Sequence, residues 1–287
     1  MNAARRTIKQ EVRFAGVTLF TGVESRVTLS PGGQGVRFSR GGVAPVPLTP
    51  DAISYKPVVP ALAGVPARHT CVASPGGDVA TVEHLLSALV GLGITDLDID
   101  VGGPEVPIFD GSAKPFVDLI LAAGLRELGG AARRATPQQA IRVDDGRGGS
   151  ITLHPAPGQA TYEYILDYPD PAPLAPQRAS WSGDADVYAR EVAPARTFSF
   201  EHEARAMHSL GLFRAFTPRD MLVLGVQGPI DNALRFPDEP ARHKLLDLVG
   251  DLLLAGVNFE GRVVAHRAGH RLNHEMARRI RDIAGLA

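Results

Sequence analysis

Three side chains that can bind or polarise a metal ion recur at one-turn intervals in the C-terminal half of the chain. His243, Asp247 and Asp251 occupy positions i, i+4 and i+8, and no proline lies between them. On an α-helix these positions fall within an arc of about 80°, so the side chains share one face. A histidine and an aspartate one turn apart can bind one divalent ion while a second acid supports the site from behind. Because the same spacing occurs in ordinary helix surface pairs, both interpretations stay open.

A third metal ligand would have to come from elsewhere among the nine histidines. A catalytic zinc usually has three protein ligands and one position for water. His84 is the most attractive candidate because Glu83 precedes it inside an otherwise apolar segment, and a carboxylate beside a catalytic metal can act as general base. An isolated Glu-His dipeptide is more often a plain helix pair with one member exposed. The pairing of His84 with the later segment is therefore a hypothesis.

His270 follows a predicted strand on a glycine-containing turn, which is a suitable place for a general acid. The residues alone favour a simpler interpretation, a hydrogen-bonded loop histidine. The pairs His266–His270 and His270–His274 are also four residues apart and are rival metal pairs. Neither pair has a flanking carboxylate, so both rank below the His243 segment.

Composition excludes several classes of function. The chain has 287 residues, of which 44% are hydrophobic and 21% charged, and its net charge is −1. This balance is typical of a globular protein with a sizeable core, and it offers no basic field for nucleic acid or an anionic membrane. The single cysteine, Cys71, excludes an internal disulfide and favours a reducing compartment; we expect its thiol to be buried and inert.

Neither end of the chain predicts export or membrane insertion. Residues 1–12 carry three cations without an apolar segment, unlike a secretory signal. The longest apolar stretch, at 252–257, is too short to span a bilayer. We therefore expect a soluble cytoplasmic protein.

The candidate residues need a scaffold, and periodicity in the first part of the chain predicts one of mixed type. Alternating residues predict strands at 11–29, where a turn intervenes, and at 96–101, while segment 32–48, rich in glycine, valine and proline, predicts further short strands and turns. Apolar residues at helical spacing predict one helix from Thr81, which can cap it, to about residue 90, and a second helix at 114–123.

The second part of the chain repeats this mixture after a break. Segment 124–139 is small, charged and without periodicity, so we interpret it as a linker between domains at 1–128 and 138–287. Strands are predicted at 140–143, 150–154, 161–168 and 262–266, and helices at 184–192, 202–210, 240–255 and 274–283. Segments 84–91 and 244–250 resemble each other and each precedes a strand, which suggests a duplicated α+β unit.

Taken together, several segments resemble the zinc-dependent UDP-3-O-acyl-N-acetylglucosamine deacetylases of lipid A biosynthesis. The matching segments are 81–89, 109–113, 115–117, 195–198, 234–239, 242–251 and 269–273. They occur in the family's order and at similar spacing, from about residue 7 to residue 279. The resemblance implies an α+β fold of two related domains, with helices sandwiched between two sheets and the active site at the domain junction. It also implies a monomer that acts on a small-molecule UDP-sugar lipid.

The resemblance also implies a role for each candidate residue. Zn²⁺ would be held by His84, His243 and Asp247, and Glu83 would take a proton from the attacking water. The positively charged His270 would stabilise the oxyanion and protonate the leaving amine, with Asp251 as its charged partner and Thr197 as a further donor to the oxyanion. The substrate's sugar, diphosphate and uridine contacts would include Lys244, Phe198 and Tyr168.

The chain departs from the family pattern at three places. Phe20 stands where the family has a histidine, Phe109 stands where it has a methionine, and segment 214–220 replaces a stretch rich in glycine and small residues. All the expected metal and proton-transfer residues are retained. Two alternatives follow: a zinc deacetylase for a different N-acetyl sugar, and a metal-binding relative without catalysis. The second is disfavoured because binding alone needs neither Glu83 nor His270.

Overall fold

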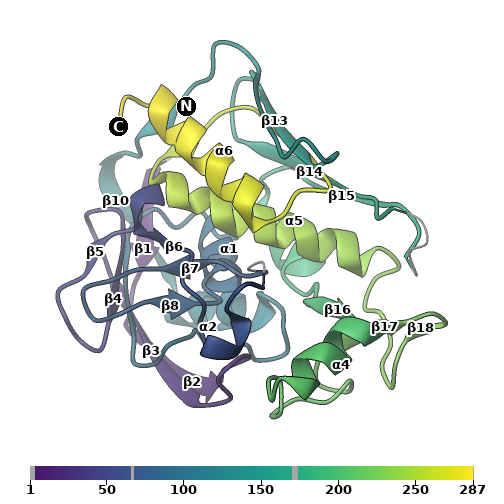
Figure 1. The fold of residues 1–287 in the computed structure, drawn as a ribbon. Helices are drawn as coiled ribbons and strands as arrows, with labels where there is room; N and C mark the ends of the chain where they lie inside the picture. The colour runs from purple at the N-terminus through teal and green to yellow at the C-terminus, as the bar shows by residue number, and fades with distance from the viewer. Residues whose placement is uncertain (1–3, 66–67, 170–173, 287) are drawn as a thin grey trace.

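Two five-stranded mixed sheets enclose a layer of helices in the computed structural model, which describes residues 4–65, 68–169 and 174–286 (Figure 1). The first sheet has the order β2 (Val12–Val17), β3 (Glu24–Pro31), β9 (Leu97–Val101), β4 (Val36–Arg40) and β5 (Val46–Pro47). The second has the order β12 (Ile141–Asp144), β13 (Ser150–His154), β20 (Arg262–His266), β14 (Thr161–Leu166) and β15 (Gln177–Trp181).

The two sheets have the same topology. Each has one parallel pair, β4 with β9 and β14 with β20, and its other neighbours are antiparallel. In each, the strand at the centre is the one that follows a buried helix: β9 follows α1 (Glu83–Gly91) and β20 follows α5 (Glu239–Leu252). The sheets thus repeat one α+β arrangement, as the weak internal similarity of the sequence suggested.

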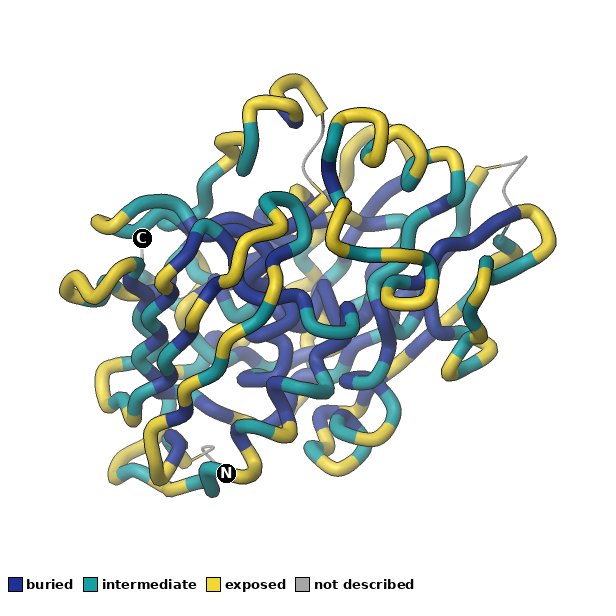
Figure 2. Tube along the Cα trace, turned by 90° about the horizontal axis from the view of Figure 1, so that it is seen from below, coloured by how far each residue is buried: buried dark blue, intermediate teal, exposed yellow. Residues whose placement is uncertain are grey.

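Four helices fill the space between the sheets. Helix α5 packs on β14 and β15, α6 (His270–Ile283) packs on β12 and β13, and α2 (Lys114–Ala123) packs on β2. Helix α1 contacts both α2 and α5. Every residue of α1 except Val90 is buried, which is typical of an inner helix that has no solvent face. Figure 2 shows the buried stretches gathered in this interior and the exposed residues on the surrounding loops.

The contact between α1 and α5 depends on a glycine. A Cβ placed on Gly250 would lie 2.1 Å from the backbone oxygen of Glu83, so only glycine permits this approach. The two helices therefore approach each other closely at Glu83, the residue before His84. At the other end of α1, a Cβ on Gly91 would lie 2.1 Å from the ring of Tyr188.

Smaller elements surround this core. Three-stranded sheets are formed by β6 (Ile53–Ser54), β7 (Cys71–Val72) and β8 (Val79–Ala80), and by β16 (Phe198–Phe200), β17 (Leu222–Gly225) and β18 (Gly228–Pro229). Helix α4 (Glu201–Ser209) packs on β16 and β17, where Phe200, Leu222 and Leu224 form a small core of their own. Short helical turns lie at Pro50–Ala52, Pro60–Leu62 and Leu253–Ala255. None of the described helices is long and apolar enough to cross a membrane.

The predicted linker at 124–139 is not irregular, and this part of the prediction was wrong. It contains β10 (Leu125–Ala131), which pairs with β1 (Ala4–Ile8), and β11 (Arg134–Ala135), which pairs with β19 (Asn258–Phe259). Backbone hydrogen bonds form these strands even though the side chains show no alternation. The pairing changes from the N-terminal half to the C-terminal half between residues 131 and 134, inside the segment that we propose divides the domains 1–128 and 138–287.

Several predicted element boundaries also differ. Thr81 does not cap α1: its backbone is left-handed, with φ +56°, and Val82 occupies the cap position. The predicted helix at 184–192 is the short α3 (Ala185–Val187) followed by a π-helical turn at Tyr188–Val192. Helix α6 begins at His270, four residues before the predicted start, so His270 is on a helix and not on a loop.

Candidate active site

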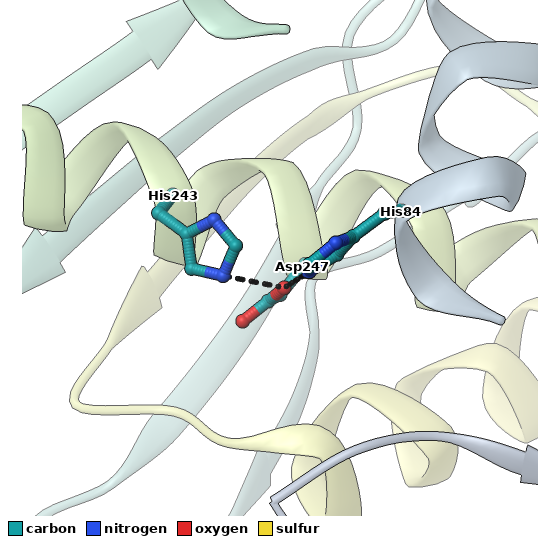
Figure 3. A group of neighbouring side chains, drawn as sticks. All are labelled: His84, His243 and Asp247. Carbon is teal, nitrogen blue, oxygen red and sulfur yellow. Dashed lines mark ion pairs between the residues drawn. The ribbon is translucent and has the colours of Figure 1, made fainter. Parts of the chain in front are cut away.

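The three candidate metal ligands converge where α1 and α5 cross (Figure 3). The Nε2 atom of His84 lies 3.6 Å from Oδ1 of Asp247, and Nε2 of His243 lies 3.3 Å from the same oxygen. One ligand atom from each residue lies within 4.8 Å of the other two, and all three side chains are buried. Among the described residues this is the only group of three or more metal-capable side chains with such geometry.

The donor atoms fit a cation. Oδ1 of Asp247 is buried and has no hydrogen-bond partner among the described residues, an arrangement that is costly unless something positive faces it. Nδ1 of His243 lies 3.2 Å from the backbone oxygen of Ala195, which makes Nδ1 the donor and leaves the Nε2 lone pair facing Oδ1. Burial lowers the pKa of His243 to about 3 against the opposing charge of Asp247, so its ring is neutral and able to bind a metal. Two imidazole nitrogens and one carboxylate oxygen suit a catalytic zinc site with an open position.

Lys244 holds the other oxygen of Asp247. Its Nζ donates to Oδ2 over 2.8 Å. Burial alone would lower the pKa of Lys244, but the charge of Asp247 outweighs it and the pKa is raised. Burial likewise opposes ionisation of Asp247, but neighbouring groups, the charged Lys244 among them, hold its pKa well below the usual range. Asp247 is therefore ionised, with one oxygen taken and the other free for an ion.

Glu83 begins α1 directly before the ligand His84 and is 4% exposed. Its Oε2 accepts a hydrogen bond from the backbone N–H of Thr70 at 3.0 Å. Burial raises the pKa of Glu83, although the nearby His270 and His84 oppose that rise. A carboxylate whose affinity for a proton is increased in this way is suited to general-base catalysis.

His270 and Asp251 form a buried ion pair near the candidate metal ligands. Nδ1 of His270 lies 2.8 Å from Oδ2 of Asp251, and Nε2 lies 3.9 Å from Oδ2 of Asp247. Burial would lower the pKa of His270, but the charge and hydrogen bond of Asp251 outweigh burial and raise it to about 9. The His270 ring is therefore protonated at neutral pH. Its Nε2 lies beside the candidate metal ligand Asp247, where its proton can serve in acid catalysis.

The remaining predicted residues line one cavity of about 1900 Å³ that includes all three ligands. The Thr197 backbone N–H donates to the oxygen of Gly111 over 2.7 Å, which joins this residue to the N-terminal half. Phe198 begins β16, and Tyr168 packs edge-on against Phe200 at 5.2 Å between ring centroids. Lys244 also lines the cavity, so all the predicted site residues except Asp251 reach it directly.

The cavity lining is chemically mixed. Its basic residues are Lys56, Arg68, Arg147, Arg205, Lys244, Arg267, Arg271 and Arg278, and acidic residues line it as well. Its apolar residues include Leu62, Val65, Met207, Phe213, Phe216 and Ile230. The lining therefore offers both cations and apolar surface to a ligand.

The three departures from the expected pattern have different structural consequences. Phe20 lines the cavity and packs on His69, 4.7 Å between centroids, and on Phe213, 5.5 Å. Residues 216–218 of the altered segment also line it. Phe109 instead packs between Phe14 and Phe116. Two departures therefore change the cavity wall, while the third belongs to packing beneath the N-terminal sheet.

Sequence reasoning missed two residues that hold the site together. Thr70 contacts both Glu83 and Asp251, and Asn273 donates from Nδ2 to Oδ2 of Asp251 over 2.8 Å. Asn273 lies three residues after His270 on the same helix, and this spacing could have indicated it. Thr70 lies in an irregular segment just before the two-residue strand β7, and nothing in its surroundings in the sequence points to a function.

The sequence of the chain is similar to known proteins over nearly its whole length. The sequence model of the LpxC family, described as UDP-3-O-acyl N-acetylglycosamine deacetylase, matches residues 5–282. The UDP-3-O-acyl-N-acetylglucosamine deacetylase of Synechocystis sp. is 36% identical over 283 residues, which span 96% of this chain and 98% of the relative.

Proposed function

The chain belongs to the LpxC family of UDP-3-O-acyl N-acetylglycosamine deacetylases, and on that premise we propose that it hydrolyses the acetamide of UDP-3-O-acyl-N-acetylglucosamine and releases acetate in lipid A biosynthesis. One observation carries the proposal most strongly. A buried His84–His243–Asp247 group, with an unpartnered carboxylate oxygen, opens into the same cavity as a buried acid and a protonated histidine. Hydrolysis of an amide needs carbonyl polarisation, an activated nucleophile and protonation of the leaving amine, and a metal, a base and an acid can supply all three.

In this proposal His84, His243 and Asp247 hold Zn²⁺. When bound, the ion supplies Lewis-acid activation of water and of the acetamide carbonyl. The second oxygen of Asp247 stays engaged by Lys244, so the carboxylate is held at both ends. His243 keeps its orientation through the backbone oxygen of Ala195.

Glu83 accepts a proton from the water that attacks the acetamide carbon, because its buried carboxylate gains by accepting one. The charged His270 ring stabilises the oxyanion. It then gives its Nε2 proton to the amine nitrogen as the carbon–nitrogen bond breaks. Asp251 keeps His270 charged through the Nδ1 bond. The Thr197 hydroxyl is assigned to the oxyanion as a further donor.

The cavity lining offers cations and apolar side chains, which suit the two ends of this substrate. Lys244, Phe198 and Tyr168 are assigned to the sugar, diphosphate and uridine, and apolar residues of the lining are assigned to the acyl chain. We propose that the enzyme acts in the cytoplasm as a monomer, on a small-molecule UDP-sugar lipid and without a nucleic-acid partner. The near-neutral net charge supports the assignment without a nucleic-acid partner, and the single cysteine supports a reducing compartment such as the cytoplasm.

A substrate pair tests the function. The purified zinc-loaded chain is assayed for acetate release from UDP-3-O-acyl-N-acetylglucosamine and from UDP-N-acetylglucosamine. We expect kcat/KM to be higher for the acylated sugar by about two orders of magnitude or more, because burial of the acyl chain contributes binding energy in the transition state. Release of acetate from neither sugar would contradict the proposal.

Phe20 gives a second candidate function some support. It carries no hydrogen-bonding group and contacts His69 and Phe213 at the cavity wall, which changes the surface that a substrate would meet. A zinc deacetylase for a different N-acetyl sugar would then release acetate faster from an acyl-free sugar in the same assay. A metal-loaded chain inactive on every N-acetyl sugar would instead favour the non-catalytic relative.

A further inference from the structure

Thr70 is a completely buried residue that joins the two proton-transfer groups, yet none of the roles assigned above uses it. Its backbone and its side chain face different partners. The backbone N–H donates to Oε2 of Glu83 at 3.0 Å, and the hydroxyl lies within hydrogen-bond reach of Asp251 and His274. One residue of the N-terminal half thus contacts the proposed base on α1 and the partner of the proposed acid on α5.

The direction of the hydroxyl bond follows from its partners. Asp251 has a lowered pKa, since the charge and hydrogen bond of His270 outweigh burial, so it is ionised and can only accept. The Thr70 hydroxyl must therefore donate its single proton to Oδ1 of Asp251. His270 and Asn273 both donate to the other oxygen, Oδ2. The three donors together fix the rotation of the carboxylate about its side-chain bond.

A second set of contacts fixes the Thr70 hydroxyl itself. Because its proton goes to Asp251, its oxygen can only accept from Nε2 of His274, which lies 2.8 Å away. Nδ1 of His274 is then free to accept from the Tyr55 hydroxyl at 3.3 Å. Burial lowers the pKa of His274 to about 4, which agrees with a neutral ring donating at Nε2 and accepting at Nδ1.

We propose that Thr70 is a positioning residue that aims both proton-transfer groups: its amide orients Glu83, and its hydroxyl, held by His274, orients Asp251 so that Oδ2 faces His270. The role rests on the proposed deacetylase function. Thr70 is neither a candidate metal ligand nor one of the residues that line the cavity, so it acts through Glu83, Asp251 and His270. Loss of the hydroxyl should therefore slow the chemical step and leave substrate binding intact.

The test compares Thr70→Val with Thr70→Ser in the zinc-loaded enzyme. Valine keeps the shape and the backbone N–H but leaves Asp251 Oδ1 and His274 Nε2 without their partner. We expect Thr70→Val to lower kcat by about 10- to 100-fold with KM and zinc content unchanged, as for a displaced catalytic group. Thr70→Ser, which restores the donor, should stay within about threefold of wild-type kcat, a difference too small to reflect a displaced group.

Thr7→Val is the matched control. Thr7 is also completely buried in the N-terminal half, and its oxygen accepts from the backbone N–H of Gly32 far from the site along the chain. Its kcat should match wild type, so a loss in Thr70→Val cannot be ascribed to removing any buried threonine hydroxyl. If Thr70→Val does not fold, His274→Leu removes the donor that fixes the hydroxyl and should lower kcat by a smaller factor, again without a change in KM.

The outcomes separate this inference from the proposed function. A Thr70→Val enzyme with kcat within threefold of wild type, or a Thr70→Ser enzyme as slow as Thr70→Val, would overturn the role of Thr70. Absence of deacetylation by the wild-type chain would overturn the function. Proton NMR of the zinc-loaded chain then decides on Thr70 without substrate: the His270 Nδ1 proton should be resolved in wild type and in Thr70→Ser, and broadened by exchange in Thr70→Val. An unchanged resonance in Thr70→Val would contradict the inference.

Discussion

The two buried helices α1 and α5 occupy corresponding places beside two sheets of the same topology, but they carry different parts of the proposed chemistry. Helix α1 contributes two residues to the candidate site, Glu83 and His84, both in its first turn. Helix α5 contributes along two turns of one face, with His243, Asp247 and Asp251. Neither helix has a complete ligand set, so the site exists only where the two helices meet.

This difference has a structural cause. The first side chains of α1, Glu83 and His84, line the cavity. The helix follows Thr81, whose left-handed backbone is a costly conformation for a β-branched residue. Hydrogen bonds from the Thr81 hydroxyl to the backbone oxygens of Ala80 and Val106 help to hold this conformation. Helix α5 instead packs against α1, and Gly250 lets the two backbones come close together. A duplicated fold can thus form one active site from unlike parts of its two copies.

Among the residues that are not metal ligands, the largest effect is expected from Glu83 of α1. Glu83→Gln keeps the shape of the side chain but cannot accept a proton, so kcat should fall by about two orders of magnitude or more while zinc content stays at the wild-type level. Steady-state kinetics together with metal analysis of the same preparation measures both. Near wild-type turnover would show that α1 supplies a ligand and nothing else.

In the proposed mechanism one limb of the pH profile belongs to Glu83 of α1, and the other belongs to His270 of α6, whose charge Asp251 of α5 supports. An ionised Glu83 is needed as base, and burial raises its pKa, so the acidic limb of kcat/KM should lie above the usual range of a glutamate. A protonated His270 is needed as acid, so activity should fall about tenfold per pH unit above about pH 9. Asp251→Asn removes the charge that raises the pKa of His270, and it should move the basic limb toward lower pH, by more than it moves the acidic limb. A basic limb that does not move would contradict the role of His270.

A smaller effect should distinguish the glycines of the two helices. In both Gly250→Ala and Gly91→Ala the new Cβ would lie 2.1 Å from a neighbouring atom, so each should destabilise the fold by roughly 1–3 kcal/mol in denaturant unfolding. Gly250→Ala collides with the backbone of Glu83 and should also lower kcat, whereas Gly91→Ala collides with the Tyr188 ring and should lower kcat less. Equal losses of kcat would contradict the claim that the site depends on the α1–α5 contact.

Residue spacing alone predicted which side chains of one helix share a face. One helical face brings His243, Asp247 and Asp251 together, and the helix α5 confirms that face. The Glu83-His84 dipeptide made His84 the best candidate for the third ligand, but its assignment rested on resemblance to a family, because no local rule states which distant histidine completes a metal site. The α+β class and the major helices also followed from periodicity and from that resemblance.

The remaining features depend on tertiary contacts that leave no periodic pattern. Strands of two or three residues, such as β7 and β16, are too short to alternate. Strand β10 forms because β1 provides its backbone partner, although its own side chains predicted a linker. Thr70 reaches Asp251 across 181 positions of sequence, a distance at which only the fold can bring two residues together.

The central claim is that one metal ion is held jointly by α1 and α5, and its most direct test is metal stoichiometry. Elemental analysis of purified, zinc-equilibrated protein should find one zinc per wild-type chain, close to none in His84→Ala or His243→Ala, and one in Glu83→Gln, with deacetylase activity absent from both histidine variants. Circular dichroism should show all the variants folded. One tightly bound zinc retained in both His84→Ala and His243→Ala would contradict the shared site.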